Sequence, residues 1–154
     1  MRIISVLTVF AVASLLGAAA SGIARWSGVE LRGYEKKLAP KINAQKVALE
    51  SLAKYDNHSV MIVHRAGDGE AEIHENQVDV FVCQTGEAVL IIGGSVIGGK
   101  TTAPGEIRGT SIQGGQKMKL TPGDIVHIPI QTAHQVMVEK GRQFTYVIVK
   151  VDSK

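Results

Sequence analysis

Cysteine and aromatic residues are scarce in this sequence. Cys83 is the single cysteine, so an internal disulfide is excluded and the folded domain has to be held together by its hydrophobic core. Phe, Trp and Tyr make up 5% of the 154 residues, and no run of basic residues interleaved with aromatic ones occurs. A nucleic-acid-binding surface usually contains such a run, so we do not expect nucleic acid as a partner.

The chain also lacks a strong excess of charge of either sign. It has 17 Lys and Arg against 14 Asp and Glu, a formal net charge of +3, and 45% of its residues are hydrophobic. This balance is typical of one globular domain with a sizeable core. Cys83 lies in an apolar stretch, where we expect a small buried residue; a functional thiol is the alternative.

The first part of the chain lacks charge almost completely. Arg2 is followed by no charged residue until Arg25, and the apolar run ends in the small residues Ala18–Ala20. This pattern is typical of a secretory signal peptide, so we expect residues 1–20 to be removed and the protein to be exported, to the periplasm or the extracellular space. An uncleaved membrane anchor is the alternative, because the uncharged run Ile3–Ala24 is long enough to span a bilayer.

Residues 21–57 predict a helical segment ahead of the main domain. From Arg32 to Lys54, apolar residues recur every three or four positions, as they do on one face of an amphipathic helix. Pro40 removes one backbone hydrogen bond, which predicts a kink or a new helix start near Ala39. We expect the apolar face to pack on the outside of the domain, or on a second copy of the chain in a homodimer.

Residues 58–154 predict an all-β domain. The helical period ends after Ser59, and short β-branched runs then alternate with glycine-rich turns. Such a series favours antiparallel pairing in a sandwich or barrel over a parallel α/β sheet. The expected strands are Val60–Arg65, Glu70–His74, Val78–Gln84, Ala88–Ile92, Ile107–Ile112, Lys117–Leu120, Asp124–Ile128, Gln135–Glu139 and Phe144–Val151.

Four side chains of this domain are suited to binding a metal. Glu72 and His74 are two residues apart, so on a strand both project from the same face. If the following strand, Val78–Cys83, forms a hairpin with theirs, Asp79 returns to that face. His134, far along the chain, is the possible fourth ligand. Two nitrogen and two oxygen donors suit one divalent transition metal.

The positions of these side chains resemble the first motif of the cupin family, and the resemblance covers about the last two thirds of the chain. That motif is G-x5-H-x-H-x(3,4)-E-x6-G. His74 has the place of the second histidine, and Glu72 stands where the first histidine is expected. Asp79 has the place of the glutamate, six residues before Gly86.

A later stretch is similar to the second cupin motif, G-x5-P-x-G-x2-H-x3-N. Gly123, Pro129 and His134 fall at the expected spacing. Gln131 replaces the second glycine and Val138 replaces the asparagine.

The resemblance implies a jelly-roll β-barrel of antiparallel strands around a pocket, with one divalent metal (Mn, Fe, Ni or Zn) bound by Glu72, His74, Asp79 and His134. Both departures from the motif retain an oxygen donor, which favours a retained metal site because an unpaired buried carboxylate is costly. A metal-free polar cluster is the alternative. Cupins include oxygenases, decarboxylases, isomerases and lyases as well as binding modules, so an enzyme and a non-catalytic ligand-binding or sensing domain both stay open.

Three further residues are candidates for binding a small-molecule ligand. Arg108 and Lys100 lie in a long glycine-interrupted stretch, residues 100–115, and could hold an anionic substrate at the barrel mouth; solvated surface charge is the alternative. His127 alternates with Ile125, so it lines the cavity or lies on the outer face. No residue has a spacing that identifies a catalytic acid or base.

The stretch Gly94–Thr101 matches the phosphate-loop pattern G-x-x-x-x-G-K-[ST]. A phosphate loop has to open a helix whose N-terminal amides bind the phosphates, but Thr102–Gly105, which contains Pro104, does not favour a helix. We therefore do not expect a nucleotide site.

Overall fold

The computed structural model describes residues 22–153. The signal peptide predicted for residues 1–20 lies outside the described residues, so its cleavage and the export of the protein stay predictions. Within residues 22–153, no helix has the length and apolar character needed to cross a membrane.

The described chain begins with one helix, α1 (Gly28–Leu38). Ser27 caps this helix: its hydroxyl accepts a hydrogen bond from the Glu30 amide, and the Glu30 carboxylate accepts one from the Ser27 amide at 2.7 Å. A short 3-10 helix, η1 (Ala39–Lys41), follows with Pro40 in its first turn. The break predicted at Pro40 is therefore confirmed, because proline fits the start of a helix and not its interior.

The helix predicted over Arg32–Lys54 ends earlier than expected. Its first part is confirmed by α1, but Val47–Lys54 forms strand β1, so the prediction is wrong there. The two faces of this strand have different surroundings. Ala48 packs beneath α1, whereas Val47 and Leu49 line a cavity on the other side.

Tertiary pairing explains this difference. Strand β1 pairs with β2 (His58–Arg65) from Val47 to Lys54, with one irregularity between Ser51 and Ala53, and this pairing satisfies the β1 backbone groups that face β2. Helix propensity and apolar spacing are weak preferences, and a complete ladder outweighs them. The β-sheet therefore begins at Val47, inside the stretch of residues 21–57 that we had assigned to the helical segment, and not at residue 58.

The rest of the described chain is almost entirely short strands, and every pairing between them is antiparallel. After β1 and β2, the strands are β3 (Ala71–His74), β4 (Gln77–Gly86), β5 (Ala88–Ile92), β6 (Ser95–Ile97), β7 (Lys100–Ala103), β8 (Glu106–Gly109), β9 (Ser111–Gln113), β10 (Gln116–Leu120), β11 (Ile125–Ile128), β12 (His134–Met137) and β13 (Phe144–Asp152). The stretch that matches the phosphate-loop pattern thus runs through β6 and into β7, and opens no helix.

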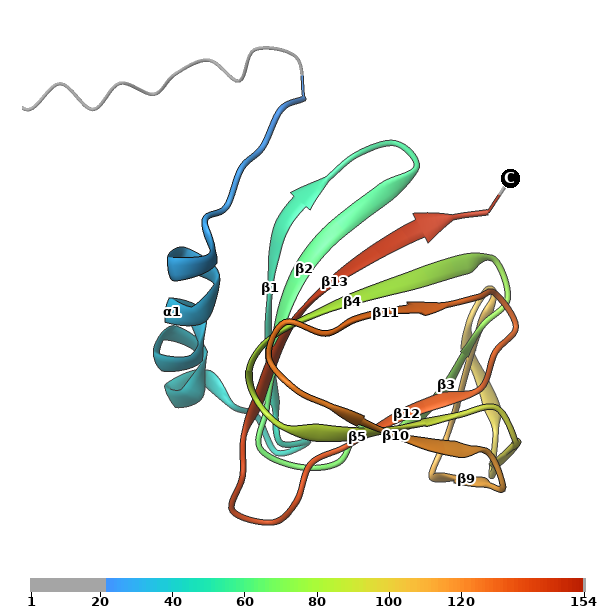
Figure 1. The fold of residues 1–154 in the computed structure, drawn as a ribbon. Coiled ribbons are helices and arrows are strands. Elements are labelled where there is room, and N and C mark those ends of the chain that lie inside the picture. Colours follow the sequence, from blue (N-terminus) through green and yellow to red (C-terminus); the bar gives the residue numbers. More distant parts are fainter. Residues whose placement is uncertain (1–21, 154) are drawn as a thin grey trace, which may run out of the picture.

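Two sheets face each other and enclose the interior of the domain (Figure 1). The five-stranded sheet has the order β1-β2-β13-β4-β11, and the six-stranded sheet has the order β10-β5-β12-β3-β8-β7. A small two-stranded sheet, β6-β9, lies at one end. The architecture is the all-β, antiparallel jelly-roll barrel that the sequence predicted.

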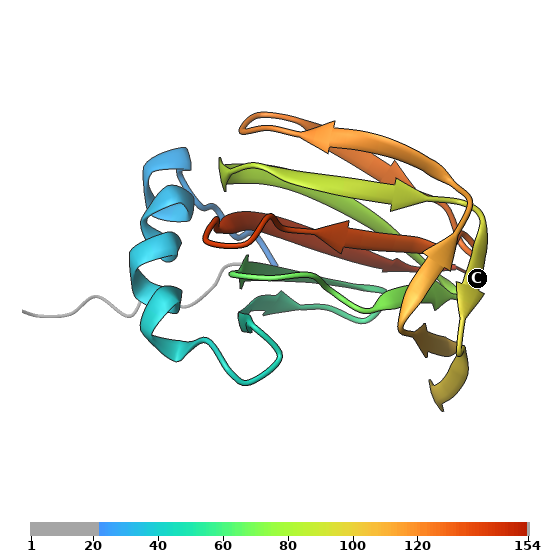
Figure 2. The same ribbon diagram turned by 90° about the horizontal axis from the view of Figure 1, so that it is seen from below.

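Helix α1 covers the outer face of the five-stranded sheet, on the side away from the six-stranded sheet (Figures 1 and 2). Leu38 is completely buried there against Ala48, Ile62 and Val147. Full burial of a leucine side chain contributes about 1.5–3 kcal/mol. The apolar face of the helix therefore packs on the chain's own sheet, as the first of the two sequence-based alternatives expected.

The main core lies between the two sheets. Strand β13 shows the alternation that separates the two apolar regions: Phe144, Tyr146 and Ile148 point inward, and Val147 and Val149 point toward α1. Cys83 is 2% exposed in the inner core, and burial raises the pKa of its thiol to about 11. It is the small buried residue that the sequence predicted.

Candidate metal centre

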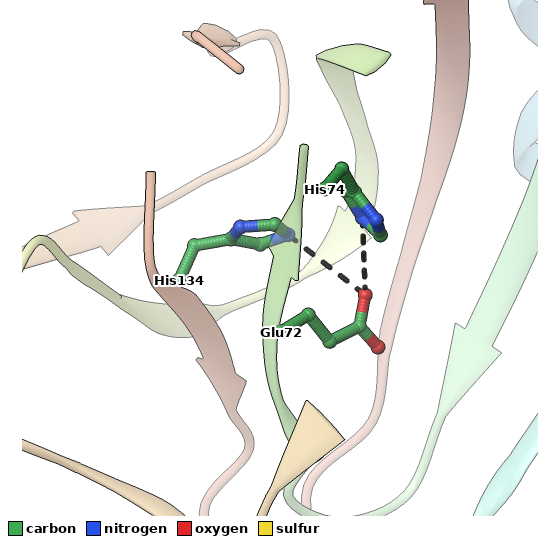
Figure 3. Close-up of side chains that lie close together, drawn as sticks. All are labelled: Glu72, His74 and His134. Atoms are coloured by element: carbon green, nitrogen blue, oxygen red, sulfur yellow. Dashed lines mark ion pairs between the residues drawn. The ribbon is translucent and has the colours of Figure 1, made fainter. Parts of the chain in front are cut away.

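Three predicted ligands meet inside the barrel at the six-stranded sheet. Glu72 and His74 both point inward from β3, and His134 of β12 lies directly opposite Glu72 in the pairing of the two strands. Glu72 Oε2 lies 3.4 Å from His74 Nε2 and 3.8 Å from His134 Nε2. The three side chains converge in Figure 3, and one donor atom from each lies within 4.8 Å of the others. This cluster could hold a metal ion.

Asp79 reaches the same point from the opposite sheet. Its Oδ2 lies 3.3 Å from His74 Nε2 and 3.7 Å from His134 Nε2. The predicted hairpin is wrong, however, because β3 and β4 belong to different sheets and do not pair. The short break at Glu75 and Asn76 carries the chain from one sheet to the other, so Asp79 faces Glu72 and His74 across the interior instead of beside them.

Neighbouring groups fix the orientation of both imidazoles. His74 Nδ1 lies 2.7 Å from Glu106 Oε1, and His134 Nδ1 lies 3.0 Å from the Thr132 carbonyl oxygen. An acceptor beside Nδ1 keeps the proton on that nitrogen, which leaves Nε2 free to act as a ligand atom. Glu106 is a residue that the sequence analysis missed. Its place opposite His74 in the β3–β8 pairing is the reason for its contact.

The donor set fits a metal ion in its chemistry, and in its spacing around His74. Donor atoms bound to one ion at about 2.1 Å, at angles between a right angle and a tetrahedral angle, lie about 3.0–3.4 Å apart. The two separations at His74 Nε2, 3.4 and 3.3 Å, lie in this range, whereas the two at His134 Nε2, 3.8 and 3.7 Å, are wider. Among the described residues, moreover, the buried His134 Nε2 has no hydrogen-bond partner, although it points at two carboxylates. A buried polar atom without a partner is rare and calls for an explanation.

Lys150 is a second residue that sequence reasoning missed. Its Nζ lies 2.9 Å from His74 Nε2, and 2.9 and 3.2 Å from the two Asp79 oxygens. Lys150 pairs directly with Asp79 across β13 and β4, so both point inward. The alternation of Phe144-Thr145-Tyr146-Val147-Ile148-Val149-Lys150 contained the relevant signal, because Lys150 has the parity of the three inward-facing residues of β13.

Arg108 adds positive charge on the other side of Glu72. The two residues are opposite each other in the β3–β8 pairing, and the Arg108 guanidinium donates a hydrogen bond to Glu72 Oε1. Burial raises the pKa of Glu72, but the hydrogen bond with His74 and the charge of Arg108 outweigh burial and lower that pKa to about 2. The pKa of Asp79 is also lowered, since His74 and Lys150 outweigh its burial. Both carboxylates are therefore ionised at neutral pH.

The two imidazoles differ in how they hold a proton. Burial lowers the pKa of His74, but its hydrogen bonds with Asp79 and Glu72 raise the pKa to about 9. The carboxylates thus favour protonation of His74, which places a second positive charge beside the Lys150 ammonium. At 2.9 Å, however, only one of His74 Nε2 and Lys150 Nζ can donate a hydrogen bond to the other. For His134 burial dominates and lowers the pKa, so this imidazole is neutral at physiological pH.

A cavity of about 960 Å³ opens beside the cluster, within the size range of small-molecule sites. Glu72, Asp79, His134 and Lys150 line one part of it. Apolar side chains supply much of the rest, among them Val47, Met61, Val63, Phe81, Ile91, Val136, Tyr146 and Ile148.

Two of the three predicted ligand-binding residues line this cavity. Arg108 and Lys100 are both part of its wall, together with Arg65, whose Nε donates to the Tyr146 hydroxyl at 3.0 Å. His127 does not line the cavity, so its candidacy as a ligand-binding residue is wrong and the outer-face alternative holds. His127 is exposed, because it alternates in β11 with the buried Val126 and Ile128 and therefore points outward.

No family model matches the sequence, and no curated protein matches it. Several solved structures are similar in fold. A conserved protein with a double-stranded β-helix domain from Klebsiella pneumoniae subsp. pneumoniae superimposes with a TM-score of 0.56 at 17% identity, over 84% of this chain and 90% of that chain. The cupin domain of Cnp3 from Schizosaccharomyces pombe gives a TM-score of 0.54 at 10% identity, over 74% and 71%. The DMSP lyase DddQ from Ruegeria pomeroyi gives 0.51 at 16% identity, over 76% and 53%.

At these identities the likeness establishes the fold. The chain has the cupin fold, a double-stranded β-helix, as the two motifs implied. Together with the Glu72, His74 and His134 cluster, the fold is consistent with a metal-binding cupin whose neighbours in structure include an enzyme. A shared fold does not select an activity.

Proposed function

We propose that this protein binds one divalent transition metal ion through Glu72, His74, Asp79 and His134, and that it binds a small polar molecule in the adjoining cavity. The observation that supports the metal most directly is His134 Nε2. This atom is buried, keeps no proton because Nδ1 donates to Thr132, and has no hydrogen-bond partner among the described residues. A bound cation is the simplest partner for it.

Oxygen donors make up half of this ligand set, which favours Mn or Fe, with Ni and Zn as further candidates, over a thiolate-type zinc site. Such an ion, when bound, supplies Lewis acidity or activation of oxygen. The chain's own residues prepare the site for it. Glu106 holds the His74 ring so that Nε2 faces the cluster, and Arg108 keeps the Glu72 carboxylate ionised and in place.

The cavity favours a small molecule that has both an apolar and an anionic part. Phe81, Val136 and Ile148 offer apolar surface close to the cluster. Arg65 and Lys100 lie on the same wall, and neither forms an ion pair with a carboxylate within residues 22–153. Arginine binds carboxylates and phosphates with paired hydrogen bonds, so a carboxylate-bearing ligand suits this wall.

An enzyme of the oxygenase, decarboxylase, isomerase or lyase type is the first form of this proposal, since the same fold occurs in a lyase. A non-catalytic binding or sensing domain is the second. One observation favours a metal-free variant of the second form: the Lys150 ammonium already balances the charge of Asp79, so the cluster is satisfied in part without a metal. We further propose export after removal of residues 1–20, which N-terminal sequencing of the secreted protein would test.

Metal analysis of protein purified without chelator tests the proposal. We expect about one equivalent of metal in the wild type, and a loss of most of it in Glu72→Ala and His134→Ala. His127→Ala is the matched control, because it removes an exposed imidazole that does not reach the cluster. A metal content that is low in the wild type and unchanged in Glu72→Ala and His134→Ala would refute the metal site.

Catalysis needs a separate assay. Metal-loaded protein should consume a member of a panel of small acids, polyols and phenolics in the presence of oxygen, if the protein is an enzyme. Binding of a panel member without turnover would instead favour the binding domain.

A further inference from the structure

The ammonium group of Lys150 lies among the atoms that would bind the metal. It contacts His74 Nε2 at 2.9 Å and Asp79 Oδ1 at 2.9 Å, and these are two of the proposed ligands. Asp79 is 1% exposed, so its charge needs a partner whenever no metal is bound. Lys150 supplies that partner.

The ammonium group and a metal ion cannot both use His74 Nε2 at the same time. The Nδ1 proton of His74 points at Glu106, so Nε2 is the ring atom that faces the cluster, 2.9 Å from Lys150 Nζ. A metal ion can bind Nε2 only when this nitrogen carries no proton and no ammonium hydrogen points at it. Lys150 also contacts both Asp79 oxygens, at 2.9 and 3.2 Å, so its positive charge lies where a metal cation would meet this carboxylate.

We propose that Lys150 is a built-in counter-ion that occupies the cluster in the metal-free protein, and that a metal ion has to displace it. Lys150 thereby sets how tightly the protein binds metal. This inference rests on the proposed metal site and adds to it the residue that controls its affinity.

The cavity beside the cluster can accommodate the displaced Lys150 side chain. Lys150 lines the 960 Å³ cavity, and 16% of its side chain is exposed. Four rotatable bonds let a lysine turn its ammonium group toward the water of a cavity while its stem stays packed. Once released, the ammonium group would face the space in which an anionic ligand binds, so metal loading would also add a positive charge to the ligand site.

The first test compares metal affinity in two lysine variants by isothermal titration calorimetry with Mn²⁺ and Zn²⁺. Lys150→Met removes the competing ammonium group and keeps a long unbranched side chain, and we expect it to bind metal at least tenfold more tightly than the wild type. Lys117→Met is the control, since it removes the same charge from an exposed position on β10. Its metal affinity should equal that of the wild type.

The second test uses the wild type alone, so it does not depend on how well Lys150→Met folds. Lysines are acetylated briefly with and without saturating Zn²⁺, and each peptide is quantified by mass spectrometry. Release of Lys150 predicts acetylation several times faster with Zn²⁺ than in EDTA, with Lys117 unchanged as internal reference. Slower or equal acetylation of Lys150 with Zn²⁺ would overturn the inference.

The outcomes separate the two proposals. Metal binding by the wild type with no gain in Lys150→Met overturns the role of Lys150 and leaves the metal site standing. Metal binding by Lys150→Met alone supports the role of Lys150 and overturns the metal site of the natural protein. Failure of both proteins to bind overturns both proposals.

Discussion

The Asp79–Lys150 pair allows the sharpest prediction about stability. In the metal-free protein the two groups are in direct contact at 2.9 Å, and their side chains are 2% and 16% exposed. Removing one partner of a buried ion pair costs about 3–5 kcal/mol, because the other charge is left uncompensated. For Asp79→Asn we expect a smaller loss, about 2–3 kcal/mol, since Lys150 can turn toward water in the cavity.

A double-mutant cycle isolates the pair. Free energies of unfolding would be measured by urea denaturation in EDTA for the wild type, Asp79→Asn, Lys150→Met and the double variant. The double variant leaves no uncompensated charge of this pair, so it should lose less stability than the sum of the single variants, with a coupling of about 1–3 kcal/mol. Asp124→Asn is a control for Asp79→Asn, because Asp124 caps a turn at Thr121 away from the cluster.

Two results would refute this reasoning. If the Asp79 carboxylate were solvated, Asp79→Asn would cost little, so a loss below about 0.5 kcal/mol would mean that Asp79 is not buried against Lys150. Strict additivity in the cycle would mean that the two groups do not interact.

Three further predictions concern pH and backbone geometry. Metal affinity should keep rising with pH up to about 9, because the pKa of His74 is about 9 and a metal ligand has to lose its proton. A metal affinity that is constant from pH 7 upward in calorimetry would contradict this prediction. The pKa of Glu72 falls from 4.5 to about 2 on folding, so this group stabilises the fold above pH 4.5, and that contribution is lost as the pH falls toward 2. The free energy of unfolding, measured by urea denaturation, should therefore depend less steeply on pH in Glu72→Gln than in the wild type. Gly86→Ala should lower the free energy of unfolding by more than about 2 kcal/mol, because Gly86 has φ 73° and an added Cβ would collide with the Gln143 carbonyl. Gly123→Ala is the control: Gly123 also has a positive φ but faces open space, so this change should cost only about 1–2 kcal/mol. Equal losses of stability in thermal melts of the two variants would exclude the collision.

Sequence patterns predicted the barrel well because strand alternation is a local property. In Val78–Gln84, for example, the alternation of Asp79, Phe81 and Cys83 with Val80 and Val82 already separates an inner from an outer face, and the structure places the first three inside. The same rule placed Glu72 and His74 on one face, whereas Asp79 meets them from the opposite sheet and not through the predicted hairpin.

The helix prediction failed beyond Leu38 for the opposite reason. Spacing alone could not show that Val47–Lys54 has a partner strand in His58–Arg65, because that pairing is a property of two segments together. The face of His127 stayed open for a similar reason, since it was fixed only when Val126 and Ile128 were placed in the core.

The sequence by itself determined which side chains could bind a metal, and it determined the fold class, because residue chemistry and the period of two are local. Only the tertiary structure decided what surrounds them. Glu106, Arg108 and Lys150 reach the cluster through pairings between strands distant in sequence, with His74, Glu72 and Asp79 respectively. Lys150 in particular lies 71 positions from Asp79 along the chain. Its contact with the ligands depends on the register of β13 against β4, which no local pattern encodes.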